Sequence, residues 1–253
     1  MTKQVALYRI PEILEVARIL DDSVLNDYNY SIKSKYNSEK ARETLGKFNK
    51  ANGELTGSNP FMLVYLANSG FLPNGSRLAE RKDLETATFL DNSFLSESYT
   101  DFGLALRTEG DSCHLLAKIL AEQLKERGIA LGKGKLISLN SLKLKEDRNS
   151  LYGLVFNLSE NAEGITNLED YKWDHSREDG LACAYFGSHR DCDSSDTHLA
   201  YSGNSGRVVC ISAEGASQKI LDEHLVNFQK ARDEEITKIQ ERYAKAEVIL
   251  KGK

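Results

Sequence analysis

The 253-residue chain has few cysteines and no long apolar run. Its cysteines form no C-x-x-C pair, so reduced thiols are a simpler expectation than a disulfide scaffold in a chain of this length. No stretch approaches the roughly 18 consecutive apolar residues of a membrane span. The N-terminal MTKQVALYRIPEIL lacks the apolar core and cleavage site of a signal peptide. We therefore expect no transmembrane segment and no signal peptide, which leaves both the cytoplasm and a virion open.

An excess of basic residues is also missing. The net charge is −5, the pI is about 5.7, and both signs are mixed along the chain. Nucleic-acid partners reward a basic face, so we expect no nucleic-acid partner. The apolar fraction of 40% and the charged fraction of 28% are those of an ordinary globular protein. A chain of this length can bury one large core or two modest ones.

Hydrophobic periodicity predicts an α+β protein. We expect helices at 11–22, from about Ala79, from a cap at Asp111 and Ser112 to about Arg127, and at 217–250. A short buried element should end at Gly70, and strands are expected at 99–110, 135–142, 151–158, 181–186 and 207–212. In the first strand, Phe102, Leu104 and Leu106 should share a face. The expected organisation is an N-terminal helical segment (1–60), a central domain (61–214) and a C-terminal helix (215–253).

One segment differs in composition from the rest, and we name residues 183–206 the polar stretch. It contains no Lys, Glu, Gln, Trp or Met, although Lys, Glu and Gln are frequent elsewhere. Its polar residues all have codons that end in C or T. Such a set is expected where the first two adenines of asparagine codons are replaced at random. Chance is the alternative explanation of this composition.

The histidines, cysteines and aspartates of the polar stretch suggest a metal site, but their spacing does not favour one. Structural zinc sites commonly begin with two cysteines two to four residues apart, whereas Cys183 and Cys192 are nine apart. Calcium loops alternate their oxygen ligands, and Asp196 breaks the alternation of Asp191 and Asp193. We expect no resident metal or cofactor. A metal-dependent hydrolase is the competing interpretation, with the candidate residues His189, Asp191, Asp193 and His198.

Two separated motifs resemble one known fold. LPNGSRLAERKDLETA is similar to the G-x-R-L-P-T-x-x-E-W-E-x-A segment of C-type lectin-like domains of the formylglycine-generating-enzyme type. The matching residues are Gly75, Arg77, Leu78, Asp83, Leu84, Glu85 and Ala87. Ala79 departs from the usual proline, and Leu84 from the usual tryptophan. The second motif, GLACAYFGSHRDCDSSDTHLAYSGNSGRVVCIS, resembles the closing region of that fold, where a polar variable segment leads into a last strand.

Within that fold, the chain resembles the variable proteins of diversity-generating retroelements. In those systems, reverse transcription with adenine-specific errors rewrites a repeat and so diversifies a ligand-binding surface. The resemblance implies a non-enzymatic binding protein, because the paired catalytic cysteines of formylglycine-generating enzymes and the calcium triplets of sugar-binding lectins have no match here. The residues implied as fixed are Leu199, Ala200, Ser202, Gly206, Arg207, Val208 and Val209.

The ligand-binding surface implied by the resemblance lies wholly in the polar stretch. It comprises Tyr185, Gly187, Ser188, His189, Arg190, Asp191, Cys192, Asp193, Ser195, Asp196, Thr197, His198, Tyr201, Gly203, Asn204 and Ser205. Tyr185, Arg190 and Tyr201 are its candidate hot spots, and packing at a sheet edge is the alternative role of the two tyrosines. The expected partner is a protein of unknown identity. A third interpretation is an oligomerising structural protein organised by the last helix, and the oligomeric state is left open.

Overall fold

The computed structural model describes residues 13–15, 22–51, 54–72, 76–90, 94–109, 115–161, 163–187, 189, 191–212, 236–237 and 240. The chain divides into two units, a first from Ile13 to Ala213 and a second made of Met1–Glu12 and Glu214–Lys253. In the second unit only three residues are described, and they are helical: Ile236, Thr237 and Gln240. The rest of the helix expected at 217–250 lies outside the described residues, as do Cys113 and the expected helix cap at Asp111 and Ser112.

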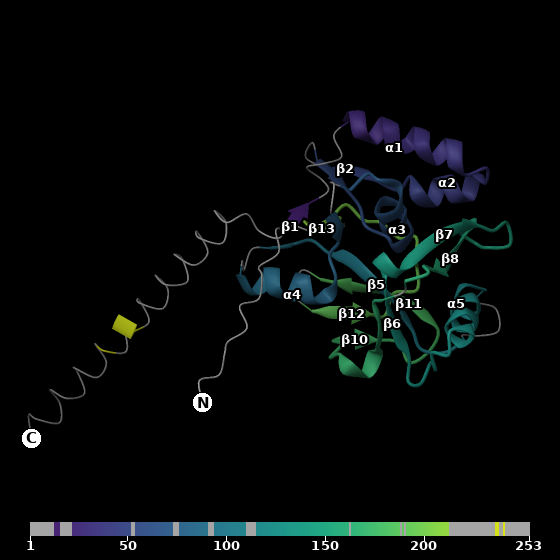
Figure 1. Cartoon of the computed structure of the whole chain (residues 1–253). Coiled ribbons are helices and arrows are strands. Elements are labelled where there is room, and N and C mark those ends of the chain that lie inside the picture. Colours follow the sequence, from purple (N-terminus) through teal and green to yellow (C-terminus); the bar gives the residue numbers. More distant parts are fainter. Residues whose placement is uncertain are drawn as a thin grey trace, which may run out of the picture. The chain divides into compact units, whose positions relative to one another are not determined.

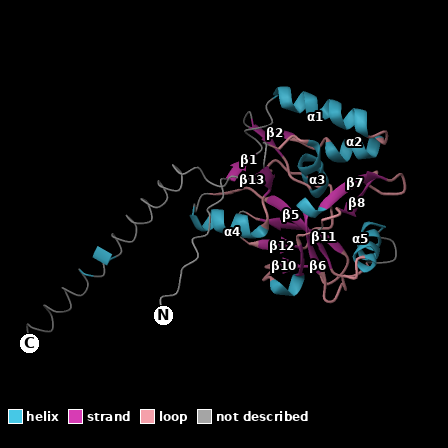
Figure 2. Cartoon of the chain, in the orientation of Figure 1, coloured by secondary structure: helices cyan, strands magenta, loops and turns pink. Residues whose placement is uncertain are grey.

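The described part of the first unit is a mixed α+β structure (Figure 2). Its α-helices are α1 (Asp22–Lys35), α2 (Glu39–Leu45), α3 (Pro60–Ser69), α4 (Arg81–Leu90) and α5 (Leu115–Glu126), with short 3-10 turns η2 (Leu139–Ser141) and η3 (Leu168–Asp170). Its strands are β1 (Ile13–Glu15), β2 (Asn49–Ala51), β3 (Glu54–Thr56), β4 (Ser76–Leu78), β5 (Thr100–Leu106), β6 (Lys135–Ser138), β7 (Leu142–Glu146), β8 (Leu154–Leu158), β9 (Ile165–Asn167), β10 (His175–Ser176), β11 (Leu181–Phe186), β12 (Cys192–Ser194) and β13 (Val209–Ser212). None of the described helices is long and apolar enough to cross a bilayer.

The largest sheet has the strand order β10-β12-β11-β5-β6-β9, and only the β10–β12 pair in it is parallel. A second, antiparallel sheet has the order β1-β13-β4, and β2-β3 and β7-β8 form separate pairs. Figure 1 shows α1 and α2 side by side at one end of this unit, with α3 beneath them. The strands around β5 and β11 therefore form its centre, and the polar stretch begins on β11.

Helix α3 shows how the local sequence sets an element at the core. The Asn59 side chain caps the helix by accepting the Met62 N–H at 2.9 Å, and Pro60 occupies the first turn, where no N–H is needed. Gly70 ends the helix in the left-handed region at φ 74°, as the sequence indicates. Every residue of α3 from Pro60 to Leu66 is buried, so this helix forms part of the main core.

The expected helix at 11–22 is wrong at its described start. Ile13–Glu15 is strand β1, which pairs antiparallel with Val209–Ile211 of β13. The apolar residues of this segment repeat at helical spacing, but a short segment cannot be assigned from periodicity alone when a partner strand is present. Backbone pairing with a strand nearly 200 residues away overrides the local pattern.

The two motifs that carry the resemblance contact each other directly. Strand β4 of the first motif pairs with β13 at the end of the second, with Leu78 opposite Cys210. Within the first motif, the guanidinium of Arg77 binds both carboxylate oxygens of Asp83 at 2.6 and 3.0 Å. Asp83 also accepts the Glu80 N–H at 2.9 Å, before α4 begins. These motif residues therefore position the start of α4 beside β13.

Candidate functional site

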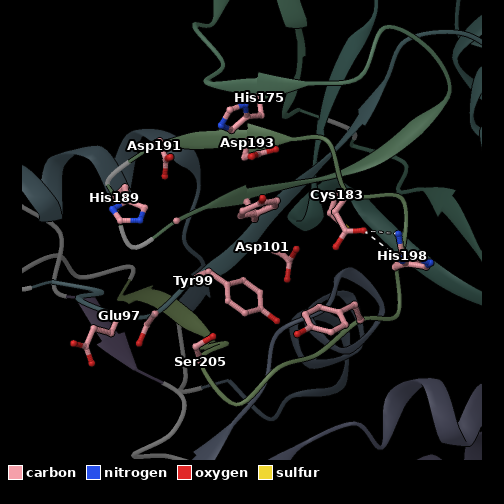
Figure 3. A pocket seen from close by; sticks show the side chains of 15 residues that line it. Glu97, Tyr99, Asp101, His175, Cys183, His189, Asp191, Asp193, His198 and Ser205 are labelled. Carbon is pink, nitrogen blue, oxygen red and sulfur yellow. Dashed lines mark hydrogen bonds and ion pairs between the residues drawn. The ribbon is translucent and has the colours of Figure 1, made fainter.

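A cavity of about 470 Å³ opens beside the polar stretch. Figure 3 shows its lining side chains, with Asp101 near the middle of the view. They come from β5 and the segment before it, from β10, β11 and β12, and from the loops on either side of β12. The lining residues are Glu97, Ser98, Tyr99, Asp101, His175, Cys183, Tyr185, Gly187, His189, Asp191, Asp193, Asp196, His198, Tyr201 and Ser205.

A shift in strand register brings Asp101 to the floor of the pocket. Leu104 of β5 lies opposite Cys183 of β11, and Asp101 lies opposite Tyr185. One residue separates Cys183 from Tyr185 on β11, whereas two residues separate Asp101 from Leu104 on β5. Opposed residues of an antiparallel pair share a face, so Asp101 and Leu104 share one. The extra residue, Phe102, packs in the other core and stacks with Trp173 at 6.4 Å. The expectation that Phe102 shares a face with Leu104 is therefore wrong.

Asp101 is a buried carboxyl with no charged partner among the described residues. It is 6% exposed, and Ser58 Oγ donates to its Oδ2 at 2.5 Å. The same hydroxyl accepts the Asp101 N–H at 3.0 Å. Burial raises the pKa of Asp101 to about 7, with a smaller contribution from the negative charge of Asp196, while the Ser58 hydrogen bond opposes the shift.

Three tyrosines surround the pocket. The rings of Tyr99 and Tyr185 meet edge to face at 6.1 Å, and burial raises the pKa of both hydroxyls. Tyr99 Oη accepts the Gly203 N–H at 2.9 Å, which fixes that loop to the pocket wall. The side chain of Tyr201 is 60% exposed at the pocket mouth. Tyr185 therefore combines sheet packing with a place in the pocket, whereas Tyr201 is available to a ligand.

The middle of the polar stretch is ordered by aspartate side chains. Asp193 Oδ1 accepts the Ser195 N–H at 2.8 Å and the Ser195 hydroxyl at 2.7 Å. Asp196 Oδ1 accepts the His198 N–H at 2.7 Å, and the Asp196 carbonyl accepts the Cys183 N–H at 2.8 Å. The Asx-type contacts fix the conformation of the loop after β12, and the backbone bond between Cys183 and Asp196 holds this loop against β11. The described residues of the polar stretch include no Lys or Arg.

The end of the polar stretch is held by backbone bonds. Tyr99 N–H donates to the Ser205 carbonyl at 3.1 Å, and the Gly57 N–H donates to the Gly206 carbonyl at 2.9 Å. Gly206 lies so close to the chain that a Cβ there would be 2.6 Å from Ser58 N. This position therefore requires glycine, as the resemblance implies for a fixed residue.

The wall before Tyr99 contains strained backbone. Leu95 and Glu97 lie in the left-handed region at φ 55° and 59°, where residues other than glycine are uncommon. Such strain persists only where the surrounding structure fixes it, and it concentrates at ligand sites. Glu97 lines the pocket, so the strained turn forms part of the site.

The structure brings together many of the surface residues implied by the resemblance. Those that line the pocket are Tyr185, Gly187, His189, Asp191, Asp193, Asp196, His198, Tyr201 and Ser205. Those that lie outside the lining are Cys192, Ser195, Thr197, Gly203 and Asn204. Ser188 and Arg190 lie outside the described residues.

Two of these residues are not surface residues. Cys192 is 5% exposed and packs in the core that contains Phe186, and Asp193 is 6% exposed. Both belong to β12, whose residues pair with β11 and β10. A strand hidden in the polar stretch therefore removes Cys192 from the expected ligand surface and leaves Asp193 at the floor.

The described cysteines are buried. Burial raises the pKa of Cys183 well above its ordinary value, and raises those of Cys192 and Cys210 to about 12 and about 11. The thiolate is the reactive form, and these thiols stay protonated at neutral pH.

The four hydrolase candidates, His189, Asp191, Asp193 and His198, all line the pocket. In the part of the chain that the structure describes, however, no three His, Cys, Asp or Glu side chains are grouped so that they could hold a metal ion.

Sequence reasoning missed the residues that form the pocket floor and wall ahead of the polar stretch. Glu97, Tyr99 and Asp101 precede it by more than 80 residues. The available signal was Asp101 itself, because an aspartate at the start of an apolar strand needs a polar partner or a function. No family model, curated protein or solved structure matches this chain.

Proposed function

We propose that this chain is a non-enzymatic ligand-binding protein whose pocket rim is diversified, as in the variable proteins of diversity-generating retroelements. By the rim we mean the residues of the polar stretch that line the pocket or lie next to it, apart from β12. The observation that supports this most is that the apolar residues implied as fixed are buried, whereas six of the fourteen described residues implied as variable are exposed. The apolar fixed residues are at most 7% exposed: Leu199, Ala200, Val208 and Val209. Residues such as His189, Ser195, His198 and Ser205 are exposed.

This separation gives variation a physical basis. An exposed side chain can be replaced with little effect on folding, whereas a buried one leaves a cavity or a clash. The backbone bonds of Tyr99 to Ser205 and of Gly57 to Gly206 hold the loop whatever side chains it carries. Because Cys192 and Asp193 are buried in β12, we assign them to the fixed part.

The C-type lectin-like fold is part of the same proposal. The direct pairing of β4 with β13, and the bidentate Arg77–Asp83 contact, support it because they join the two motifs on which the resemblance depends. The pocket supports a binding role because large, stiff tyrosines lie among small polar residues, a combination that antibody paratopes also use. Among the described residues, no group of His, Cys, Asp or Glu side chains could hold a metal ion, and burial raises the pKa of Cys183. Neither observation favours the hydrolase interpretation.

The DNA that flanks the gene tests this proposal. We expect a reverse transcriptase gene nearby and a second copy of the segment that encodes the polar stretch, with adenines at the codons of exposed residues such as His198 and Tyr201. Codons for buried residues such as Leu199 should be identical in both copies. A locus without a template copy and without a reverse transcriptase would contradict the proposal.

A further inference from the structure

The pocket has a one-sided charge. Among the fifteen described residues that line it, five carry carboxyl groups and none is Lys or Arg. The five are Glu97, Asp101, Asp191, Asp193 and Asp196. The polar stretch contributes the last three, whereas Glu97 and Asp101 belong to the segment before it. A cavity with such a lining raises the local concentration of cations.

Asp101 is a buried carboxyl of this group without a charged partner among the described residues. It is 6% exposed, and none of the ion pairs among the described residues includes it. Ser58 donates to Oδ2 alone, at 2.5 Å. A buried carboxylate without a counter-ion is unfavourable, so a cation in the pocket would find an uncompensated partner there.

Aromatic rings complete the arrangement. Tyr99 and Tyr185 meet edge to face at 6.1 Å, and Tyr201 is 60% exposed at the mouth. Aromatic faces attract ammonium and guanidinium groups and also pack against the methylenes that carry them. A hydrated metal ion makes no use of such rings. The cavity of about 470 Å³ has the size of a small-ligand site and admits one long side chain.

We propose that the pocket floor binds an organic cation, the lysine or arginine side chain of a protein ligand, with Asp101 as its counter-ion. This inference rests on the proposed function and adds the chemistry of the ligand. Tyr99 and Asp101 lie outside the polar stretch, so diversification of the rim leaves these two residues of the subsite unchanged. The floor then selects a cationic anchor common to all ligands, and the rim selects what surrounds it.

The proposal fixes the direction of the pH dependence. Asp101 must be ionised to pair with a cation, and its pKa is raised to about 7, so affinity should increase as the pH rises through 7 and then level off. Groups from several elements face Asp101: the Ser58 hydroxyl just before α3, Tyr99 just before β5, Cys183 and Tyr185 on β11, and Asp196 after β12. The described lining also contains three histidines: His175, His189 and His198.

The test is titration calorimetry of the full chain at pH 8.0 and 5.5. The probes are Nα-acetyl-lysine methylamide, its neutral analogue Nα-acetyl-norleucine methylamide, pentylamine and Ca²⁺. We expect the lysine amide to bind at least tenfold more tightly than the neutral analogue at pH 8.0, and to lose about tenfold at pH 5.5. Tighter binding of pentylamine than of the lysine amide would assign the site to a free amine and overturn the protein-side-chain source.

Variants separate Asp101 from the other charges. Asp101→Asn should lose at least tenfold in affinity for the lysine amide at pH 8.0 and most of its pH dependence. Glu160→Gln removes an exposed charge outside the lining and should bind as the wild type does. Should Asp101→Asn not fold, Asp196→Asn, which keeps the acceptor for the His198 N–H, should lose about threefold.

Three results would overturn the proposal: equal binding of the neutral analogue, wild-type binding by a folded Asp101→Asn or Asp196→Asn variant, or displacement of the lysine amide by micromolar Ca²⁺. These results are distinct from failure of the proposed function. Absence of lysine-amide binding alongside a template copy in the locus removes only the cation subsite. Lysine-amide binding without a template copy removes only the diversification.

Discussion

Among single residues, Asp101 has an electrostatic consequence at neutral pH. The unfolded chain ionises an aspartate near pH 3.8, whereas burial raises the pKa of Asp101 to about 7 in the folded protein. Between these values the folded state binds a proton that the unfolded state does not. The contribution of Asp101 to stability is therefore fully present below about pH 4, falls as the pH rises, and is lost above 7.

Replacing this carboxyl by an amide should stabilise the protein at alkaline pH. We expect Asp101→Asn to raise the free energy of unfolding by about 1–3 kcal/mol more at pH 8.5 than at pH 5. The amide oxygen can still accept the Ser58 hydroxyl, so the local hydrogen bond is kept. Urea titrations at both pH values measure the difference. A variant less stable than the wild type at pH 8.5 would show that the Asp101 carboxylate supports the fold.

Two glycines of one loop provide a matched pair. A Cβ at position 206 would be 2.6 Å from Ser58 N and 2.9 Å from Gly57 C, both backbone atoms. A Cβ at position 203 would meet only the exposed Tyr201 side chain, at 3.0 Å from its hydroxyl. Gly206→Ala should therefore destabilise the protein by about 2–4 kcal/mol, and Gly203→Ala by less than about 1 kcal/mol. Similar melting temperatures for the two variants would refute the division between a fixed Gly206 and a variable Gly203.

At the level of elements, β12 makes a different prediction from the surrounding loop. Cys192 packs at 5% exposure in an apolar core, whereas the His198 side chain is 88% exposed. Cys192→Asn buries an amide without partners and should cost about 2–4 kcal/mol, while His198→Asn should stay within about 0.5 kcal/mol. Chemical denaturation of both variants compares them directly. Equal tolerance at the two positions would return Cys192 to the variable set.

The elements with strong local signals could be predicted from the sequence. Helix α3 has a capping asparagine and a terminating glycine, and the apolar stripe of α5 is buried at Leu116, Leu120 and Leu124. Strands such as β5 and β11 follow apolar segments of the expected length. Strand β1 could not be predicted, because its conformation depends on pairing with β13. The short β12 lies in a segment without alternation, and the shift between β5 and β11 has no local sequence signal.

For the molecule as a whole, the candidate site could be predicted in part. The rim could be predicted because it comes from the polar stretch, whose composition differs from the rest of the chain. The floor comes from a distant segment, since the pairing of β5 with β11 places Asp101 opposite Tyr185. Tertiary pairing of this kind creates a site that no single window of sequence contains. Under the proposed function, a backbone-bonded frame carries the replaceable side chains of the rim.

Deep sequencing of the gene across a population of its host tests the central claim most directly. We expect substitutions to concentrate at codons of exposed positions such as His189, Ser195 and Tyr201, each traceable to a template adenine. The codons of Cys192, Leu199 and Gly206 should not change, because their side chains are buried or their backbone is crowded. A gene without variation in 183–206, or with substitutions spread equally over buried and exposed codons, would contradict the account.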